Sequence, residues 1–128
     1  MSREAIVATG APQPKVPLSQ AIRANGFVFV SGMVSRDPAT GKVEGSEIRE
    51  QTKRVLENIK TVLQAAGTSL GNGVRVTVFL KDRKDFPGFN EVYASYFPES
   101  PPARAVVQAA DFMVPGILVE IELTAVMP

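Results

Sequence analysis

Pro101-Pro102-Ala103-Arg104-Ala105-Val106-Val107 sets the architecture of the C-terminal part of the chain. The two prolines end whatever precedes them, because proline fixes its own φ and disfavours helix in the residue before it. The β-prone run that follows predicts a strand, in which Arg104 and Val106 share one face. An arginine with only valine beside it has no local partner, so burial of that face would require an anion from the protein or from a ligand.

A second alternating run, residues 118–126, offers such an anion, because it places Glu120 and Glu122 on one strand face. In one interpretation Arg104 pairs with one of these glutamates across a solvated sheet face, a common arrangement that contributes about 0–1 kcal/mol. In the other, Arg104 binds a ligand carboxylate in a cleft, and a glutamate transfers a proton or orients water. The spacing alone leaves both open.

The composition narrows the chemistry that this chain can perform. Its 128 residues predict a single domain over residues 1–128, and a net charge of +1 without blocks of like charge argues against a nucleic-acid or membrane-surface binder. The chain has no cysteine and no histidine, which excludes thiol nucleophiles, Ser-His triads and thiolate metal sites. We see no signal peptide and no apolar run of about 20 residues, so we expect a cytoplasmic protein without membrane contact.

The pattern of the chain predicts the order β-β-β-α-β-α-β-β. Asn25-Gly26 between two β-prone runs predicts a hairpin, since both residues tolerate positive φ. Ser46 is the expected N-cap of a helix that Gly67 closes, and Asp85 is the expected N-cap of a second helix. The expected strands are residues 4–8, 18–23, 27–32, 74–80, the run around Arg104, and 118–126; the expected helices are residues 47–66 and 86–96.

The helices are apolar on one side only, so they should cover one face of a mixed sheet. Phe27, Phe29, Val106 and Leu118 are expected to make the other face partly apolar as well. Because a single layer of two helices cannot cover both faces, we expect the second face to pack against other copies of the chain.

Two further places could line a ligand pocket. Ser31-Gly32 at a strand end offers a hydroxyl and an exposed backbone, although the same dipeptide also simply terminates strands. Asn90 lies one position from the buried stripe of the second helix and could reach a cleft edge, although a surface asparagine explains it equally well.

Seven segments, taken together, resemble the RidA family, also called YjgF, of reactive-intermediate imine deaminases. They follow the family's order over nearly the whole chain: residues 19–22, 25–32, 65–67, 76–82, 89–93, 102–107 and 119–122. The resemblance implies an α+β, chorismate-mutase-like fold, in which a mixed β-sheet is covered on one face by two helices. It also implies a homotrimer around a central β-barrel, with three clefts between subunits.

The resemblance further implies hydrolysis of enamines and imines, such as 2-aminoacrylate and 2-imino acids, to 2-keto acids and ammonia, without metal or organic cofactor. Arg104 falls on the arginine that grips the substrate carboxylate, and Glu120 on the glutamate that handles water or a proton. Burial would raise the pKa of Glu120, and a nearby Arg104 would lower it. The positions implied to bind substrate are Arg104, Ser31, Gly32, Asn90, Leu18 and Val106.

Three positions depart from the family's pattern. The family often has tyrosine at Leu18, glutamine at Met33 and cysteine at Val106. Leu18 and Met33 each replace a hydrogen-bonding group with an apolar one, which favours a bulkier, less polar imine or a lower deaminase rate. The alternative function is a non-enzymatic trimer that binds small carboxylates or acts as a regulatory or chaperone-like protein. A ribonuclease role is disfavoured, because the charge balance indicates no positively charged surface along which RNA could bind.

Overall fold

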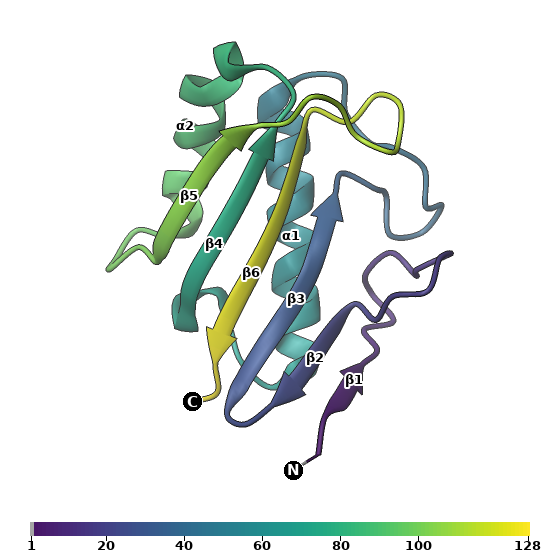
Figure 1. The fold of residues 1–128 in the computed structure, drawn as a ribbon, viewed down its shortest axis with the longest axis vertical. Coiled ribbons are helices and arrows are strands. Elements are labelled where there is room, and N and C mark those ends of the chain that lie inside the picture. Colours follow the sequence, from purple (N-terminus) through teal and green to yellow (C-terminus); the bar gives the residue numbers. More distant parts are fainter. Residues whose placement is uncertain (1) are drawn as a thin grey trace.

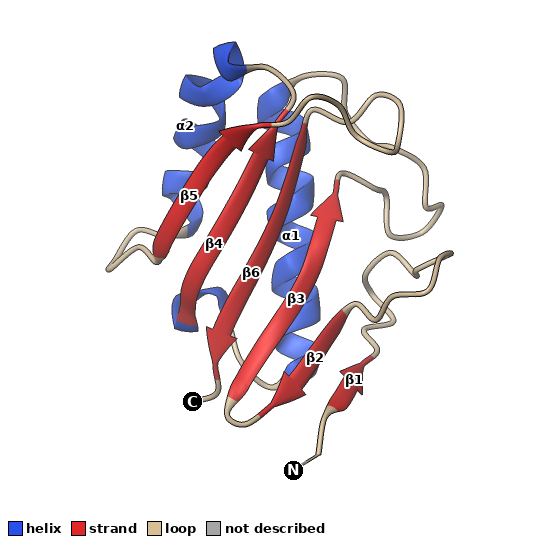
Figure 2. Cartoon of the chain, viewed as in Figure 1, coloured by secondary structure: helices blue, strands red, loops and turns tan. Residues whose placement is uncertain are grey.

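The computed structural model describes residues 2–128, which form one mixed six-stranded sheet with two helices on the same face (Figures 1 and 2). This confirms the predicted α+β class and the predicted order of elements. The strands are β1 (Glu4–Ile6), β2 (Ala21–Ala24), β3 (Phe27–Val34), β4 (Gly73–Leu80), β5 (Ala103–Gln108) and β6 (Val119–Val126); the helices are α1 (Ile48–Ala66) and α2 (Phe86–Tyr96), with 3₁₀ turns at Leu70–Asn72 and Arg83–Asp85.

The strand order in the sheet is β1-β2-β3-β6-β4-β5, so the last strand of the chain lies in the middle. All neighbours are antiparallel except β4 and β5, which run parallel because α2 carries the chain back between them. At the β2–β3 hairpin Asn25 and Gly26 have φ of 56° and 83°, the left-handed values that the Asn-Gly signal predicted.

Several predicted boundaries are wrong. β3 continues through Ser31-Gly32 to Val34, so this dipeptide does not end the strand, and β1 ends at Ile6 rather than at residue 8. Two further differences have a local reason. Leu18 was expected in a strand, but β2 begins at Ala21, and Leu18 belongs to a proline-rich loop with its side chain 47% exposed. Helix α1 is capped by Glu47 rather than Ser46, because the Glu47 carboxylate accepts a hydrogen bond from the Glu50 amide. Its C-terminal cap is Gly67, as predicted. Neither helix described here is both long and apolar enough to cross a membrane.

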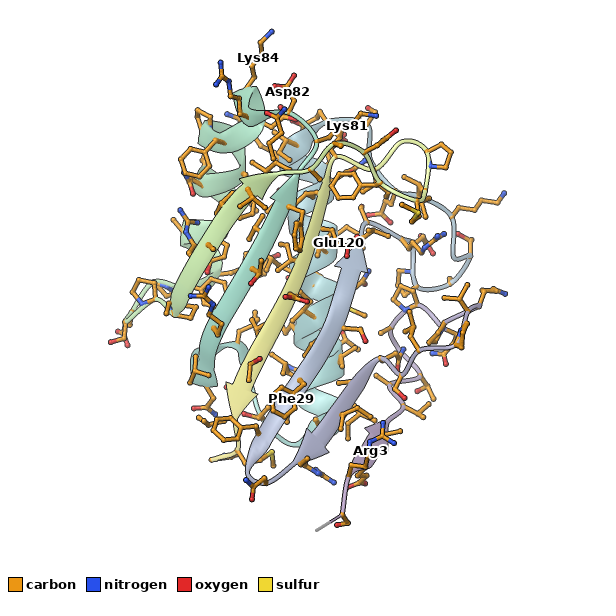
Figure 3. The ribbon with its side chains drawn as sticks, viewed as in Figure 1. Arg3, Phe29, Lys81, Asp82, Lys84 and Glu120 are labelled. Atoms are coloured by element: carbon orange, nitrogen blue, oxygen red, sulfur yellow. The ribbon has the colours of Figure 1, made fainter. Side chains whose placement is uncertain are left out.

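The two faces of the sheet differ sharply in what they bury. The helix-covered face carries the core, and Val106 and Leu118 pack against it, which corrects their assignment to the second face. The opposite face, here called the open face, exposes Phe29 and Val107 by 47% and 48%. Figure 3 shows Phe29 and Glu120 on this open face, turned away from the helices. Large exposed apolar side chains such as Phe29 occur at surfaces that another protein covers.

A buried glutamine on α1 ties two loops to the core. Gln51 is fully buried, and its amide nitrogen donates to the carbonyls of Gly45 and Gly116 at 3.0 and 2.8 Å. Its amide oxygen accepts from the Leu118 amide at 2.8 Å, immediately before β6 begins. Gln51 therefore fixes the entry of the chain into the strand that carries Glu120.

Replacing Gln51 by leucine should lower the free energy of unfolding by about 2–4 kcal/mol, because it leaves two carbonyls and an amide without partners in the interior. Gln64→Leu, on the exposed side of the same helix, is the matched control and should change it by no more than about 0.5 kcal/mol. Urea unfolding at equal protein concentration measures both. Equal midpoints for the two variants would contradict this role.

Candidate functional site

Arg104 lies on the helix-covered face of β5, against α2. It stands in register with the fully buried Val76 of β4, and its Nη2 donates to Asn90 Oδ1 at 2.7 Å. Asn90 thus reaches the arginine, as its place on the helix suggested. The guanidinium carbon also lies 4.8 Å from the ring centre of Tyr93. The arginine is therefore held by neutral groups, which orient its charge without neutralising it.

Glu120 lies on the other face of the same sheet. It stands in register with Phe79 of β4, while Glu122 is in register with Thr77, and both point to the open face. None of the four ion pairs among residues 2–128 includes Arg104. The cross-strand ion pair between Arg104 and a glutamate, one of the two interpretations left open by the sequence, is therefore wrong for the single chain.

A close approach between Gly32 and Glu120 shapes the open face. The pairing of β3 with β6 shifts by one residue between Val30 and Met33, so Ser31 and Gly32 together oppose one residue of β6. This is a β-bulge, which alternation in the sequence did not reveal. A Cβ built on Gly32 would overlap Oε2 of Glu120, so any side chain there would displace the carboxylate. The glycine therefore leaves the Glu120 carboxylate the position it occupies.

The pKa of the Glu120 carboxyl is raised above its ordinary value, first because burial disfavours the charged form and second because Glu122 is close. The expected counter-effect of Arg104 is missing, since the arginine lies on the opposite face. A raised pKa makes the Glu120 carboxylate a stronger base than an exposed glutamate, so it accepts a proton more readily.

Leu18, Ser31 and Gly32 line one cavity of about 430 Å³ at the end of β3. Its walls are mostly apolar and include Met33; the other apolar members are Pro12, Pro14, Val16, Val34 and Val114. Ser31 itself is fixed, because its hydroxyl donates to the Ser19 carbonyl at 2.6 Å. Polar side chains, including Lys15 and Arg36, line the cavity as well. The preference for a less polar substrate, expected from Leu18 and Met33, stays a prediction.

Gln20 holds the proline-rich wall of this cavity, a role that was not predicted from the sequence. The side chain is 3% exposed, and its amide oxygen accepts from the Ala8 amide at 2.7 Å. Its amide nitrogen donates to the carbonyls of Ala8 and Pro12. Only the position of a polar residue beside an apolar strand could have pointed to this anchor.

Val106 lines a second cavity, of about 550 Å³, between the start of α2 and the end of β5. Phe86 borders this cavity, and its ring centre lies 5.8 Å from the guanidinium carbon of Arg104, which does not itself line the cavity. The predicted site residues thus fall into two groups: Leu18, Ser31, Gly32 and Glu120 around β3 and β6, and Asn90, Val106 and Arg104 at the β5 edge. Among residues 2–128, no three acidic side chains cluster in a way that could hold a metal ion.

Comparisons with known proteins give consistent results. A family model described as endoribonuclease L-PSP matches residues 8–127. A RutC family protein of Pyrococcus abyssi is 48% identical over 125 residues, 98% of each chain. A mouse protein named 2-iminobutanoate/2-iminopropanoate deaminase is 40% identical over 124 residues, 97% of this chain and 91% of the mouse protein. The crystal structure of E. coli TdcF with bound serine has a TM-score of 0.90 at 33% identity, covering 98% of this chain and 99% of TdcF.

The raised pKa of Glu120 predicts a pH dependence of stability. The folded state holds this proton more tightly than the unfolded chain, whose reference pKa is 4.5. The stabilising contribution is therefore complete below that value and is lost as the pH rises through the folded pKa. Glu120→Gln, which mimics the protonated form, should gain stability relative to the unmodified protein between about pH 4 and about pH 7.

Urea unfolding at both pH values checks this, with Glu99→Gln on an exposed turn as the control for removing one surface carboxylate. A stability difference between the protein and Glu120→Gln that stays constant, or changes in the opposite direction, would contradict the raised pKa.

Proposed function

The chain belongs to the RidA (YjgF) family, whose model is described as endoribonuclease L-PSP, and on this premise we propose that it hydrolyses 2-imino acids and the related enamines to 2-keto acids and ammonia. The observation that carries the proposal is Arg104, a fixed cation whose only side-chain hydrogen bond in the described chain goes to the neutral Asn90. Such an arginine suits the carboxylate of an amino-acid-derived substrate, since its planar fork matches a carboxylate with two parallel hydrogen bonds.

The reaction needs little beyond positioning and one proton carrier. Water adds to C2 of the imine, one water proton passes to the nitrogen, and the carbinolamine then expels ammonia as its hydroxyl proton is transferred. Glu120 is the carrier in this proposal, because its raised pKa lets it accept the water proton and return it to the leaving nitrogen. Ser31 and Gly32 would line the pocket, and Leu18 and Met33 would contact an apolar substrate side chain.

This mechanism requires two copies of the chain, because the sheet separates Arg104 from Glu120 within one copy. In a closed cyclic assembly, the β5 edge of one subunit can meet the β3 and β6 region of the next, which would complete one site per interface. We infer a homotrimer with its open sheet faces directed inward around a central β-barrel. The exposed phenylalanines of the open face support this arrangement.

RNA cleavage, which the description of the family model names, has less support from this chain. Phosphodiester cleavage needs groups that move protons to and from oxygen, and the chain has no histidine for that task. Its net charge is only +1, which offers little attraction for phosphates. The remaining alternative, a carboxylate-binding trimer without catalysis, shares Arg104 and differs in turnover alone.

The assembly is predicted to have three times the 13.7 kDa mass of the chain in solution. Phe29→Asp should shift it toward monomers, because it places a charge on the surface that assembly would bury. Lys60→Asp, exposed on α1, is the control and should leave the mass unchanged. Multi-angle light scattering at micromolar concentration measures the mass of all three proteins. A stable monomer of the unmodified protein would contradict a site shared between subunits.

Arg104→Lys is predicted to lower kcat/KM as strongly as a non-conservative substitution would, because an ammonium group cannot reproduce the planar fork of the guanidinium. Loss of a desolvated bidentate contact should cost about 2–5 kcal/mol in transition-state stabilisation, or about one and a half to three and a half decades in kcat/KM. Keto-acid release from a 2-imino acid generated in situ measures this, alongside the thermal midpoint. A normally folded Arg104→Ala variant with near-normal efficiency would end the catalytic interpretation.

Leu18 is predicted to select substrates rather than to enable turnover. A leucine packs against apolar side chains, whereas tyrosine at this position would add a hydrogen-bonding group to the cavity. Leu18→Tyr should therefore lose efficiency on leucine- and methionine-derived imines relative to the alanine-derived imine. Identical substrate rankings for both proteins would place Leu18 outside the substrate's reach.

A further inference from the structure

Arg104 is surrounded on one side by aromatic rings rather than by anions. The guanidinium carbon lies 4.8 Å from the ring centre of Tyr93, 5.7 Å from that of Phe89 and 5.8 Å from that of Phe86. All three distances are within the range in which a ring face attracts a cation. The three rings, here called the aromatic shelf, all come from α2, where their spacing places them on one helix face together with Asn90.

The three rings of the shelf do not have the same structural role. Phe89 and Tyr93 are buried, and their rings stack at 5.3 Å between centres, with Tyr93 continuing onto Phe97 at 4.6 Å. These two rings belong to the core, so packing alone accounts for their position, independent of any role of Arg104. Phe86 differs, because it is 40% exposed and contributes little to the core. Its place beside Arg104 therefore calls for a different explanation.

The chemistry of the shelf suits a receptor for anions. A ring face attracts the guanidinium but accepts no strong hydrogen bond from it, so the donors of Arg104 that do not reach Asn90 stay available. The rings also exclude water from one side of the charge, which strengthens any ion pair formed on the other side. Phe86 also borders the cavity that Val106 lines, so the same ring lies beside the guanidinium and beside a space that a ligand can enter.

We propose that the aromatic shelf is a positioning device for Arg104, and that Phe86 is the member that sets the affinity of the site for carboxylates. The proposal rests on the proposed function to the extent that Arg104 binds the carboxylate of the substrate. Phe86 acts through the arginine and does not touch the reacting atoms. Its loss should therefore raise KM and weaken carboxylate binding while leaving kcat nearly unchanged.

The test compares three variants by calorimetric binding of 2-oxobutanoate, the stable keto acid that hydrolysis of 2-iminobutanoate would give, and by kinetics on the imine. Phe86→Leu should weaken binding and raise KM about three- to tenfold, the change expected for one cation–π contact, with kcat within about twofold. Phe86→Tyr keeps a ring face and should restore both values. Tyr96→Leu, which loses a ring of α2 that bonds to Glu57, should leave both values unchanged.

The outcomes separate the shelf from the proposed function. Binding that weakens in Phe86→Leu and recovers in Phe86→Tyr supports the proposed role of the shelf, whether or not the imine is hydrolysed. Absence of imine hydrolysis would contradict only the proposed deaminase activity. Wild-type affinity in a folded Phe86→Leu variant would overturn the shelf whether or not turnover occurs. Equal weakening in Phe86→Leu and Phe86→Tyr would also overturn it. Absence of saturable 2-oxobutanoate binding to the unmodified protein would overturn both proposals.

Discussion

A six-stranded sheet with Arg104 on one face and Glu120 on the other is the constraint from which the functional account follows. Two side chains on opposite faces of a sheet cannot share a ligand within one copy, because the backbone of the sheet lies between them. The cation is left with neutral neighbours, and the carboxylate is left on a sheet face that no helix or strand among residues 2–128 covers. In the proposed function, a second copy of the chain completes each half.

Each half of the site is held by groups that leave its reactive atoms free. Asn90 and the rings of α2 hold the guanidinium, while Gly32 gives the Glu120 carboxylate the space it occupies. Two buried glutamines, Gln20 and Gln51, use their side-chain amides to fix the loops that border β3 and β6. Such rigid support fits an imine hydrolase, in which the substrate is already electrophilic and placement of water and proton carries most of the rate.

The sequence predicted those features that depend on local pattern. Alternation along residues 118–126 correctly placed Glu120 opposite the core, and Asn25-Gly26 correctly placed the hairpin. Alternation could not predict the relation of Arg104 to Glu120, because that depends on β4 lying between their strands and on the parallel pairing of β5. Alternation also could not predict the bulge at Ser31-Gly32 or the anchoring role of Gln20, since both follow from tertiary contacts and not from periodicity.

Subunit complementation tests the claim of a shared site most directly. Arg104→Ala and Glu120→Gln subunits, each of low activity alone, are unfolded together in equal amounts and refolded into mixed assemblies. If each site takes Arg104 from one subunit and Glu120 from its neighbour, about a quarter of the sites become intact and a matching share of deaminase activity returns. A mixture that stays as inactive as its parents, although light scattering and mass spectrometry show mixed trimers, would contradict the shared site.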